Sequence, residues 1–207
     1  MGQRFHAIVL SAMLTAATAA AAPTFGQTVN PEPLRPVEPP RELPRLQRGQ
    51  NLDKLFEALK VAPDEASAKY VENRIWAAWH ASNSDTATLL MSRVKIAVDA
   101  KEIDLAIRLL TSIVAIKPDY VEAWNQRATL YYMKKDFGRS LADIHNVLAR
   151  EPRHFGALSG LGMIMQEFGD EKGALEAFRR ALALHPHLER IPDLVKKLTE
   201  KVEGRAI

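Results

Sequence analysis

Three prolines at equal spacing constrain the fold of this chain more than any other feature of its sequence. Pro118, Pro152 and Pro186 follow one another at a constant interval. That interval is about 34 residues, and a fixed period of roughly 20–50 residues is typical of a repeat array, in which one supersecondary unit stacks on the next. We therefore divide the chain into blocks of this length, with each proline at position 32. The three blocks are 87–120, 121–154 and 155–188.

Aligned in this way, the blocks share a pattern of large and small side chains. Large apolar residues recur at positions 4, 11 and 24, as the second block shows with Trp124, Tyr131 and Ile144. Small residues recur at positions 8 and 20, as in Gly162 and Ala174 of the third block. Two antiparallel helices approach closely only where the facing side chains are small, and large residues fill the space beside that contact. Each block is therefore expected to form two antiparallel helices.

This pattern resembles the tetratricopeptide repeat, a helix-turn-helix unit with the same period. The resemblance covers Ala87 to Leu188 and extends more loosely to residues 51–203. It implies an all-α fold, a right-handed α-solenoid of three repeats. The first block fits less well, because Arg93 occupies a position that is usually apolar and Val94 one that is usually small.

The segments on either side of the three blocks are expected to cap the array. Residues 51–86 are interpreted as an N-terminal helical pair, a degenerate repeat in which Trp76 and Trp79 fall at positions 24 and 27 while Pro63 shortens the first helix. Residues 189–203 are expected to form a C-terminal capping helix, because a terminal repeat needs a polar outer face.

The N-terminal segment, residues 1–22, has the layout of a secretory signal peptide. Arg4 stands in a short basic start, and an uncharged apolar run then leads to small residues up to Ala22. Both Ala19–Ala21 and the TFG sequence before Gln27 fit a cleavage site. The expected location is the periplasm, with no membrane span after cleavage. A retained N-terminal anchor that holds the domain facing the periplasm is the alternative.

Residues 23–50 are rich in proline, which fixes φ and cannot donate a backbone hydrogen bond. We expect them to form a disordered, extended linker that spaces the helical domain from the envelope.

Charge and cysteine content exclude several classes of function. Without the expected signal peptide the chain carries 27 Lys and Arg against 25 Asp and Glu, a balance of +2. Proteins that bind nucleic acid usually carry a basic patch, so no nucleic-acid partner is expected. Aromatic and basic residues do alternate in Glu122–Gly138, but the repeat register assigns Trp124 and Tyr131 to the core. The chain contains no cysteine, which excludes disulfides, thiolate metal sites and cysteine nucleophiles.

No catalytic constellation is recognisable, so the chain is not expected to be an enzyme or to carry a cofactor. His185 and His187 flank Pro186 and could bind a metal, but no carboxylate is placed to complete a ligand set. We expect these two side chains, and His154 after Pro152, to be solvated turn residues. The glycines of Gly156–Gly162 lack the preceding strand that a dinucleotide-binding loop requires.

The resemblance implies a concave groove that binds an extended peptide or a helix, lined by positions 2, 5, 9, 12 and 13 of the first helix of each repeat. The groove candidates are Met91, Lys95, Glu122, Asn125, Thr129, Tyr132, Met133, Ser159, Met163 and Gln166. Only Lys95 stands where some family members place a basic clamp for a C-terminal carboxylate. The expected function is a non-catalytic scaffold that binds an envelope protein partner. An enzyme built on a helical scaffold and a purely structural, self-associating module are the alternatives.

Overall fold

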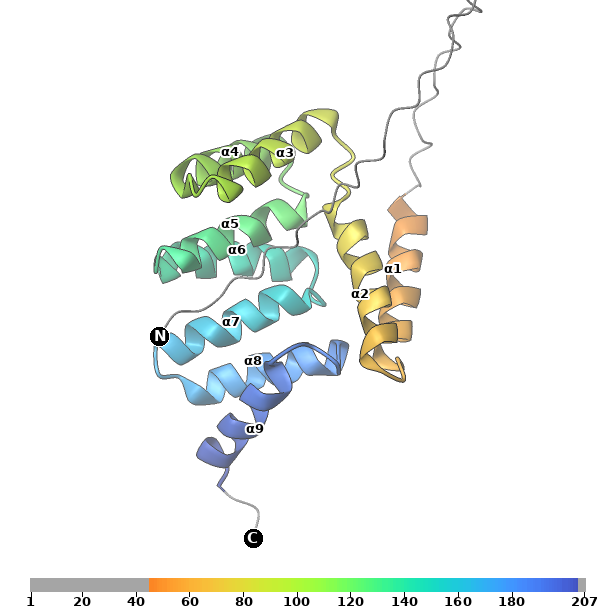
Figure 1. Cartoon of the computed structure of the whole chain (residues 1–207), viewed down its shortest axis with the longest axis vertical. Helices are drawn as coiled ribbons and strands as arrows, with labels where there is room; N and C mark the ends of the chain where they lie inside the picture. The colour runs from red at the N-terminus through yellow and green to blue at the C-terminus, as the bar shows by residue number, and fades with distance from the viewer. Residues whose placement is uncertain (1–44, 205–207) are drawn as a thin grey trace, which may run out of the picture. The chain divides into compact units, whose positions relative to one another are not determined.

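The structure is a computed structural model of the chain and describes residues 45–204, with side chains from residue 51 onward. The expected signal peptide and residues 23–44 of the expected linker lie outside the described residues. The described residues, 45–204, belong to one compact unit, which contains helices and no strand (Figure 1). The expected fold class, an α-solenoid of helical repeats, is confirmed.

Six helices form the repeat stack, two from each block of the sequence (Figure 1). They are α3 (Asp85–Asp99), α4 (Ile103–Ile116), α5 (Val121–Met133), α6 (Phe137–Arg150), α7 (Phe155–Glu167) and α8 (Glu171–Leu184). The turn inside each block has the same backbone conformation. Lys101, Lys135 and Gly169 all stand at position 15 and have φ values of 61°, 58° and 76°. A left-handed residue just after the C-cap is a common way to end a helix, so position 15, which follows the C-cap residues Ala100, Lys134 and Phe168, ends the first helix in all three blocks.

The two helices of a block approach closely at the small positions. A Cβ atom built on Gly162 of α7 would lie 2.5 Å from the ring of Phe178 on α8, a distance that real Cβ atoms do not reach. Ala106 and Ala174, at position 20, are fully buried. The second block has Ser140 at this position, and its hydroxyl donates a hydrogen bond of 2.8 Å to the carbonyl oxygen of Ala128. The polar atom is therefore satisfied without a wider helix contact.

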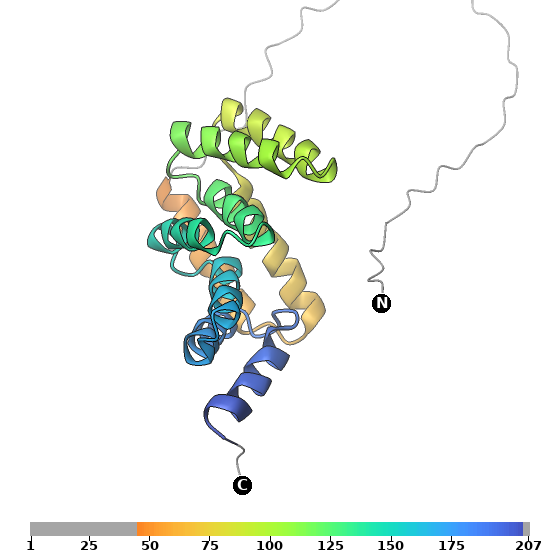
Figure 2. The same ribbon diagram turned by 90° about the vertical axis from the view of Figure 1, so that its left-hand side faces the viewer.

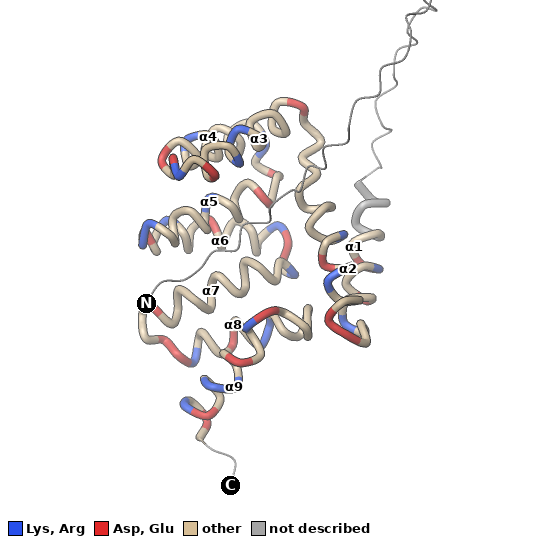
Figure 3. The backbone as a smooth tube through the Cα atoms, viewed as in Figure 1, with Lys and Arg blue, Asp and Glu red and all other residues tan. Residues whose placement is uncertain are grey.

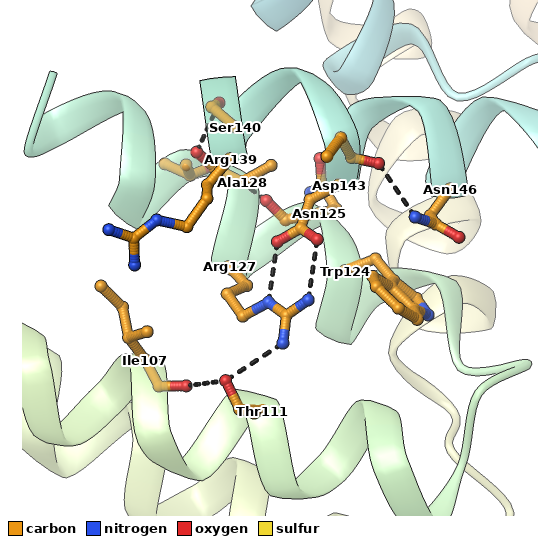
Figure 4. A network of polar contacts seen from close by, with 12 residues as sticks. Ile107, Thr111, Trp124, Asn125, Arg127, Ala128, Arg139, Ser140, Asp143 and Asn146 are labelled. Carbon is orange, nitrogen blue, oxygen red and sulfur yellow. Dashed lines mark hydrogen bonds and ion pairs between the residues drawn. The ribbon is translucent and has the colours of Figure 1, made fainter. Parts of the chain in front are cut away.

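A buried ion pair joins the two helices of the second block (Figure 4). The guanidinium of Arg127 donates two hydrogen bonds of 2.8 Å to the carboxylate of Asp143 on α6, and its third nitrogen donates one of 3.0 Å to Thr111 on α4. Tyr131 is buried as expected, whereas Trp124 is only half-buried. The Trp124 ring lies against the guanidinium groups of Arg127 and Arg150, at 5.0 and 5.2 Å from its centre.

The N-terminal helical pair does not continue the stack as a degenerate repeat. Its first helix, α1 (Arg45–Lys60), begins six residues earlier than expected, so residues 45–50 are helical and not part of a linker. Its second helix is α2 (Glu65–His80). α1 contacts α8 and α2 contacts α5, and both run across the repeats in Figures 1 and 2. We call this pair the N-terminal hairpin.

The N-terminal hairpin contacts the turns at the ends of the three blocks. The Tyr120 hydroxyl donates a hydrogen bond of 2.8 Å to the carbonyl oxygen of His80 at the end of α2. Arg153 forms an ion pair of 2.6 Å with Asp53 of α1. A ring nitrogen of His187 lies 3.1 Å from the carbonyl oxygen of Ala62. One contact at each of three successive turns holds the hairpin along the repeats.

Two of the turn histidines are buried in the contact between the N-terminal hairpin and the repeats. His154 and His185 are only 0% and 1% exposed, so the expectation that they are solvated is wrong. His154 stacks on Trp79 of α2, and Phe155 packs against both hairpin tryptophans. Aromatic burial of this kind is a large source of stability, which explains why the hairpin lies against the turns.

The last described helix, α9 (Ile191–Val202), packs on α8 through Ile191 and Leu198. Arg179 of α8 donates to both carboxylate oxygens of Glu203 just after α9. The lysines of α9 are exposed, so the helix presents a polar outer face.

Candidate functional site

A pocket of about 160 Å³ opens between α5 and α7, the first helices of the second and third blocks. Five of the expected groove residues line it: Asn125, Thr129, Tyr132, Ser159 and Met163. They come together because positions 5, 9 and 12 of a helix lie on one face. Small residues make room for the cavity, among them Ala128, Gly156, Ala157 and Gly160. We call this cavity the central pocket.

Hydrogen bonds hold the polar side chains of the central pocket. The side-chain amide of Asn125 donates to the carboxylate of Glu122, at 3.2 Å to the nearer oxygen. The Thr129 hydroxyl donates to the backbone carbonyl of Asn125 at 3.0 Å. The Tyr132 hydroxyl lies 3.5 Å from a carboxylate oxygen of Glu167, and burial together with this carboxylate raises the pKa of Tyr132. Tyr132 is therefore a neutral hydrogen-bonding group at neutral pH.

A second pocket, of about 390 Å³, lies between α3 and α5 and contains Met91 and Lys95 from the expected groove. Lys95 forms an ion pair of 2.9 Å with Asp99 one turn later. Tyr120 lines the far wall, and burial raises its pKa to about 12, with the charge of Glu122 adding to the effect. This pocket thus offers apolar surface and one cation, Lys95, which is already paired with Asp99.

A third pocket, of about 700 Å³, lies between α2 and the end of the repeat stack, and sequence analysis did not predict it. Trp76 and Glu72 of α2 form one wall, and His185 and Leu188 belong to the other. Burial acts to raise the pKa of Glu72, but hydrogen bonds from Lys69 and Trp76 outweigh it, so the pKa is lowered. Ser159 and Met163 line both this pocket and the central pocket, so the two pockets are adjacent. This wall exists because α2 lies across the repeats, and the repeat period in the sequence does not predict that position of α2.

Three expected groove residues line neither the central pocket nor the pocket between α3 and α5. Glu122 is 3% exposed, because α2 packs against α5 and His154 lies over the start of that helix. Its carboxylate is 3.5 Å from Nε2 of His154 and accepts hydrogen bonds from Asn125 and Gln126. Met133 is 61% exposed at the end of α5, and Gln166 also lies outside the lining. The candidate groove is therefore narrower than the sequence predicted.

The surface around the central pocket is nearly uncharged. None of the residues that line it is charged, and α7 has a single charged residue, Glu167 at its end (Figure 3). Within residues 45–204, no group of three or more His, Asp or Glu side chains is arranged to hold a metal ion. Among the same residues, no helix has the length and apolar character needed to cross a membrane.

Comparison with known proteins gives the fold a family. No model of a protein family matches the chain. A TPR repeat-containing protein of Rhizobium etli is 39% identical over 155 residues, which are 75% of this chain and 76% of that protein.

Solved structures of tetratricopeptide repeat domains share the fold at lower identity. The first TPR of Spaghetti (RPAP3), solved with the HSP90 peptide SRMEEVD, has a TM-score of 0.55 at 20% identity and covers 58% of this chain and 95% of that one. MamA has a TM-score of 0.54 at 17% identity, over 72% of this chain and 85% of that one. The Sgt2 TPR domain of Aspergillus fumigatus has a TM-score of 0.52 at 23% identity, over 58% and 81%. These structures share the fold, and the Rhizobium relative shows that the chain belongs to the tetratricopeptide repeat family.

Proposed function

We propose that this chain is a non-catalytic scaffold that holds an extended peptide or a helix of a protein partner along α3, α5 and α7. Domains of this family generally mediate protein–protein interaction. The observation that carries the proposal is the central pocket, a concave cavity in which apolar side chains surround a few hydrogen-bonding groups. Ligand sites commonly have this composition.

The chemistry of the pockets indicates which peptides would fit. Met163 and Tyr132 offer adaptable apolar surface, and Asn125 and Thr129 offer groups for a peptide backbone. The RPAP3 domain was solved with a peptide that ends in two acidic residues, a valine and an aspartate. Here the central pocket has no cation, and Lys95 in the neighbouring pocket is paired with Asp99. A peptide with an apolar anchor is therefore the better fit than an acidic C-terminus.

The proposed place of action is the periplasm, where the partner would be an envelope protein. The basic start and apolar run of residues 1–22 support this part of the proposal. Fractionation of cells that produce the full chain tests it: the processed protein is expected in the periplasmic fraction. Recovery of the unprocessed chain in the cytoplasm would contradict it.

A displayed peptide library tests the proposed binding site. Binders are selected on the mature chain, and their affinities are then measured for Thr129→Arg, which places a long cation in the central pocket. The matched control is Ala142→Arg, at an exposed position of α6 that does not line this pocket. We expect Thr129→Arg to weaken binding about tenfold or more, a change of about 1.4 kcal/mol. Ala142→Arg should bind normally, and both variants should unfold at the temperature of the parent. Equal binding by all three proteins would refute the groove assignment.

A further inference from the structure

The outer face of α3, on the first block, exposes two large apolar side chains. Leu89 is 58% exposed and Ile96 is 67% exposed. They stand at i and i+7, so they lie on the same face of the helix, two turns apart.

The other two blocks bury the equivalent positions. Leu89 and Ile96 stand at positions 3 and 10, which hold Ala123 and Leu130 in the second block and Ala157 and Ile164 in the third. These four residues are between 0% and 5% exposed. They are buried because α4 packs on α5 and α6 packs on α7. The face of α3 is thus a surface that the repeat uses to pack against a preceding helix.

A cation lies between the two apolar residues and can be compared with its counterpart in the second block. Arg93 stands at position 7, and the residue at position 7 of the second block is Arg127. Arg127 donates a hydrogen bond to Thr111 of α4, the helix that precedes its own block. Within residues 45–204, the structure gives Arg93 neither an ion pair nor a hydrogen bond. Its position in the register places its charge where an acceptor on a preceding helix would lie.

No described helix fills this position, because the N-terminal hairpin lies along the turns between the blocks. Figures 1 and 2 show α3 and α4 at one end of the stack, with the hairpin beside the stack and not beyond it. The hairpin contacts α5 and α8, which belong to the second and third blocks.

We propose that Leu89, Arg93 and Ile96 form a docking surface for an amphipathic helix of a partner protein. The helix would carry apolar residues around one carboxylate that faces Arg93. Charge argues against a second copy of this chain, since a two-fold contact between the α3 helices would bring the two Arg93 cations together. The surface is separate from the central pocket, so the proposal stands or falls independently of peptide binding in the groove.

The chain contains no cysteine, so a single introduced thiol can report on this surface. Ala100→Cys is suitable, because Ala100 is exposed on the same face and leaves the three proposed contact residues intact. It stands at position 14, which holds Lys134 in the second block, and Lys134 forms an ion pair with Asp104 of α4. A helix docked on α3 should therefore cover residue 100. Arg180→Cys, at an exposed position of α8, serves as the control.

The probe is a synthetic peptide with the sequence of α4, Ile103–Ile116, carrying Thr111→Glu. This helix already covers the same positions on α5, and its residue 111 meets the arginine at position 7. A peptide with Thr111→Lys is the matched comparison. The measurement is the rate at which a thiol reagent modifies the full chain, without peptide and with each peptide over a range of concentrations.

We expect rapid modification of Ala100→Cys in the free chain, at a rate independent of chain concentration. The Thr111→Glu peptide should slow it at concentrations about fivefold lower than the Thr111→Lys peptide, as expected for one exposed ion pair. Adding Arg93→Glu to the chain should reverse that order, and Arg180→Cys should respond to neither peptide.

Three results would overturn the proposal. Slow modification of the free chain at every concentration would mean that residues of the same chain cover the face. Slowing with rising chain concentration would identify a second copy as the occupant. Failure of both peptides to protect residue 100 would mean that the surface does not accept a helix.

Discussion

The indole ring of Trp79 is stacked on the imidazole ring of His154, with ring centres 4.0 Å apart and planes inclined by 11°. His154 is also the N-cap of α7, because its Nδ1 accepts a hydrogen bond of 3.1 Å from the backbone N–H of Ala157. One turn residue therefore both caps a helix of the third block and receives the N-terminal hairpin. The hairpin and the repeats are expected to unfold together.

Trp79→Ala tests how much the hairpin contributes to stability. Trp79 is 6% exposed and also packs on Phe56 and Phe155. Its truncation should lower the free energy of unfolding by about 3–5 kcal/mol, the range for large buried aromatic residues. Tyr70→Ala is the control on the same helix: its side chain is 65% exposed, and the change should cost less than about 0.5 kcal/mol. Urea denaturation provides both values, and equal values would mean that the hairpin is not packed as described.

The ion pair of Arg127 and Asp143 offers a test that uses the third block as its reference. The third block has Leu161 and Ala177 at the same two positions. Asp143→Ala alone should cost about 3–5 kcal/mol, because it leaves a buried guanidinium without its carboxylate. The double variant Arg127→Leu, Asp143→Ala, which copies the third block, should recover most of this loss. A double variant as unstable as the single one would show that the pair contributes a specific attraction that apolar packing cannot replace.

Gly162 tests the close contact between α7 and α8. Gly162→Leu should prevent the third block from packing, since even a Cβ atom would lie 2.5 Å from Phe178. We expect a fall of the melting temperature together with loss of helical circular dichroism. Gly138→Ala is the matched control, because no atom lies within 4 Å of its added Cβ. In that open helical site alanine should stabilise the protein by about 0.5–1 kcal/mol. An unchanged melting curve for Gly162→Leu would refute the repeat register.

Acidification should weaken the fold through His185. Burial lowers the pKa of His185 from its ordinary value of 6.5, and the nearby Glu72 only partly opposes this effect. The charges of His187 and Lys69 act in the same direction as burial. The unfolded chain therefore takes up the proton at higher pH than the folded protein, and stability is lost as the pH falls from about 6.5 towards the lowered pKa.

The measurement is the free energy of unfolding between pH 7 and pH 5, where most carboxylates remain ionised. His185→Gln should reduce its decline with falling pH, whereas His145→Gln, at an exposed position of α6, should not. The same pH dependence in both variants would exclude His185 as its cause.

The repeat stack could be predicted from the sequence because its signals are local and periodic. The prolines set the register, and Gly162, Ser140 and Ala106 mark where the two helices of each block meet. The hairpin could not be placed in the same way. Extending the period by one block put Trp76 and Trp79 at plausible core positions, but their contacts are turn residues far along the chain. A histidine beside a proline also looks like a surface turn until its partner is known.

The sequence also predicted part of the candidate site. Register alone brought Asn125, Thr129, Tyr132 and Met163 to one face, and they do share a pocket. It failed for Glu122, because the burial of that carboxylate depends on α2 and His154, which no repeat position represents.

The most direct test of the proposed function is a nuclear magnetic resonance titration of the chain with a peptide selected from the displayed library. The proposal predicts that the largest chemical-shift changes occur at Asn125, Thr129, Tyr132 and Met163, and that they disappear in Thr129→Arg. Changes confined to the outer helices α6 and α8, with the central pocket unaffected, would contradict it.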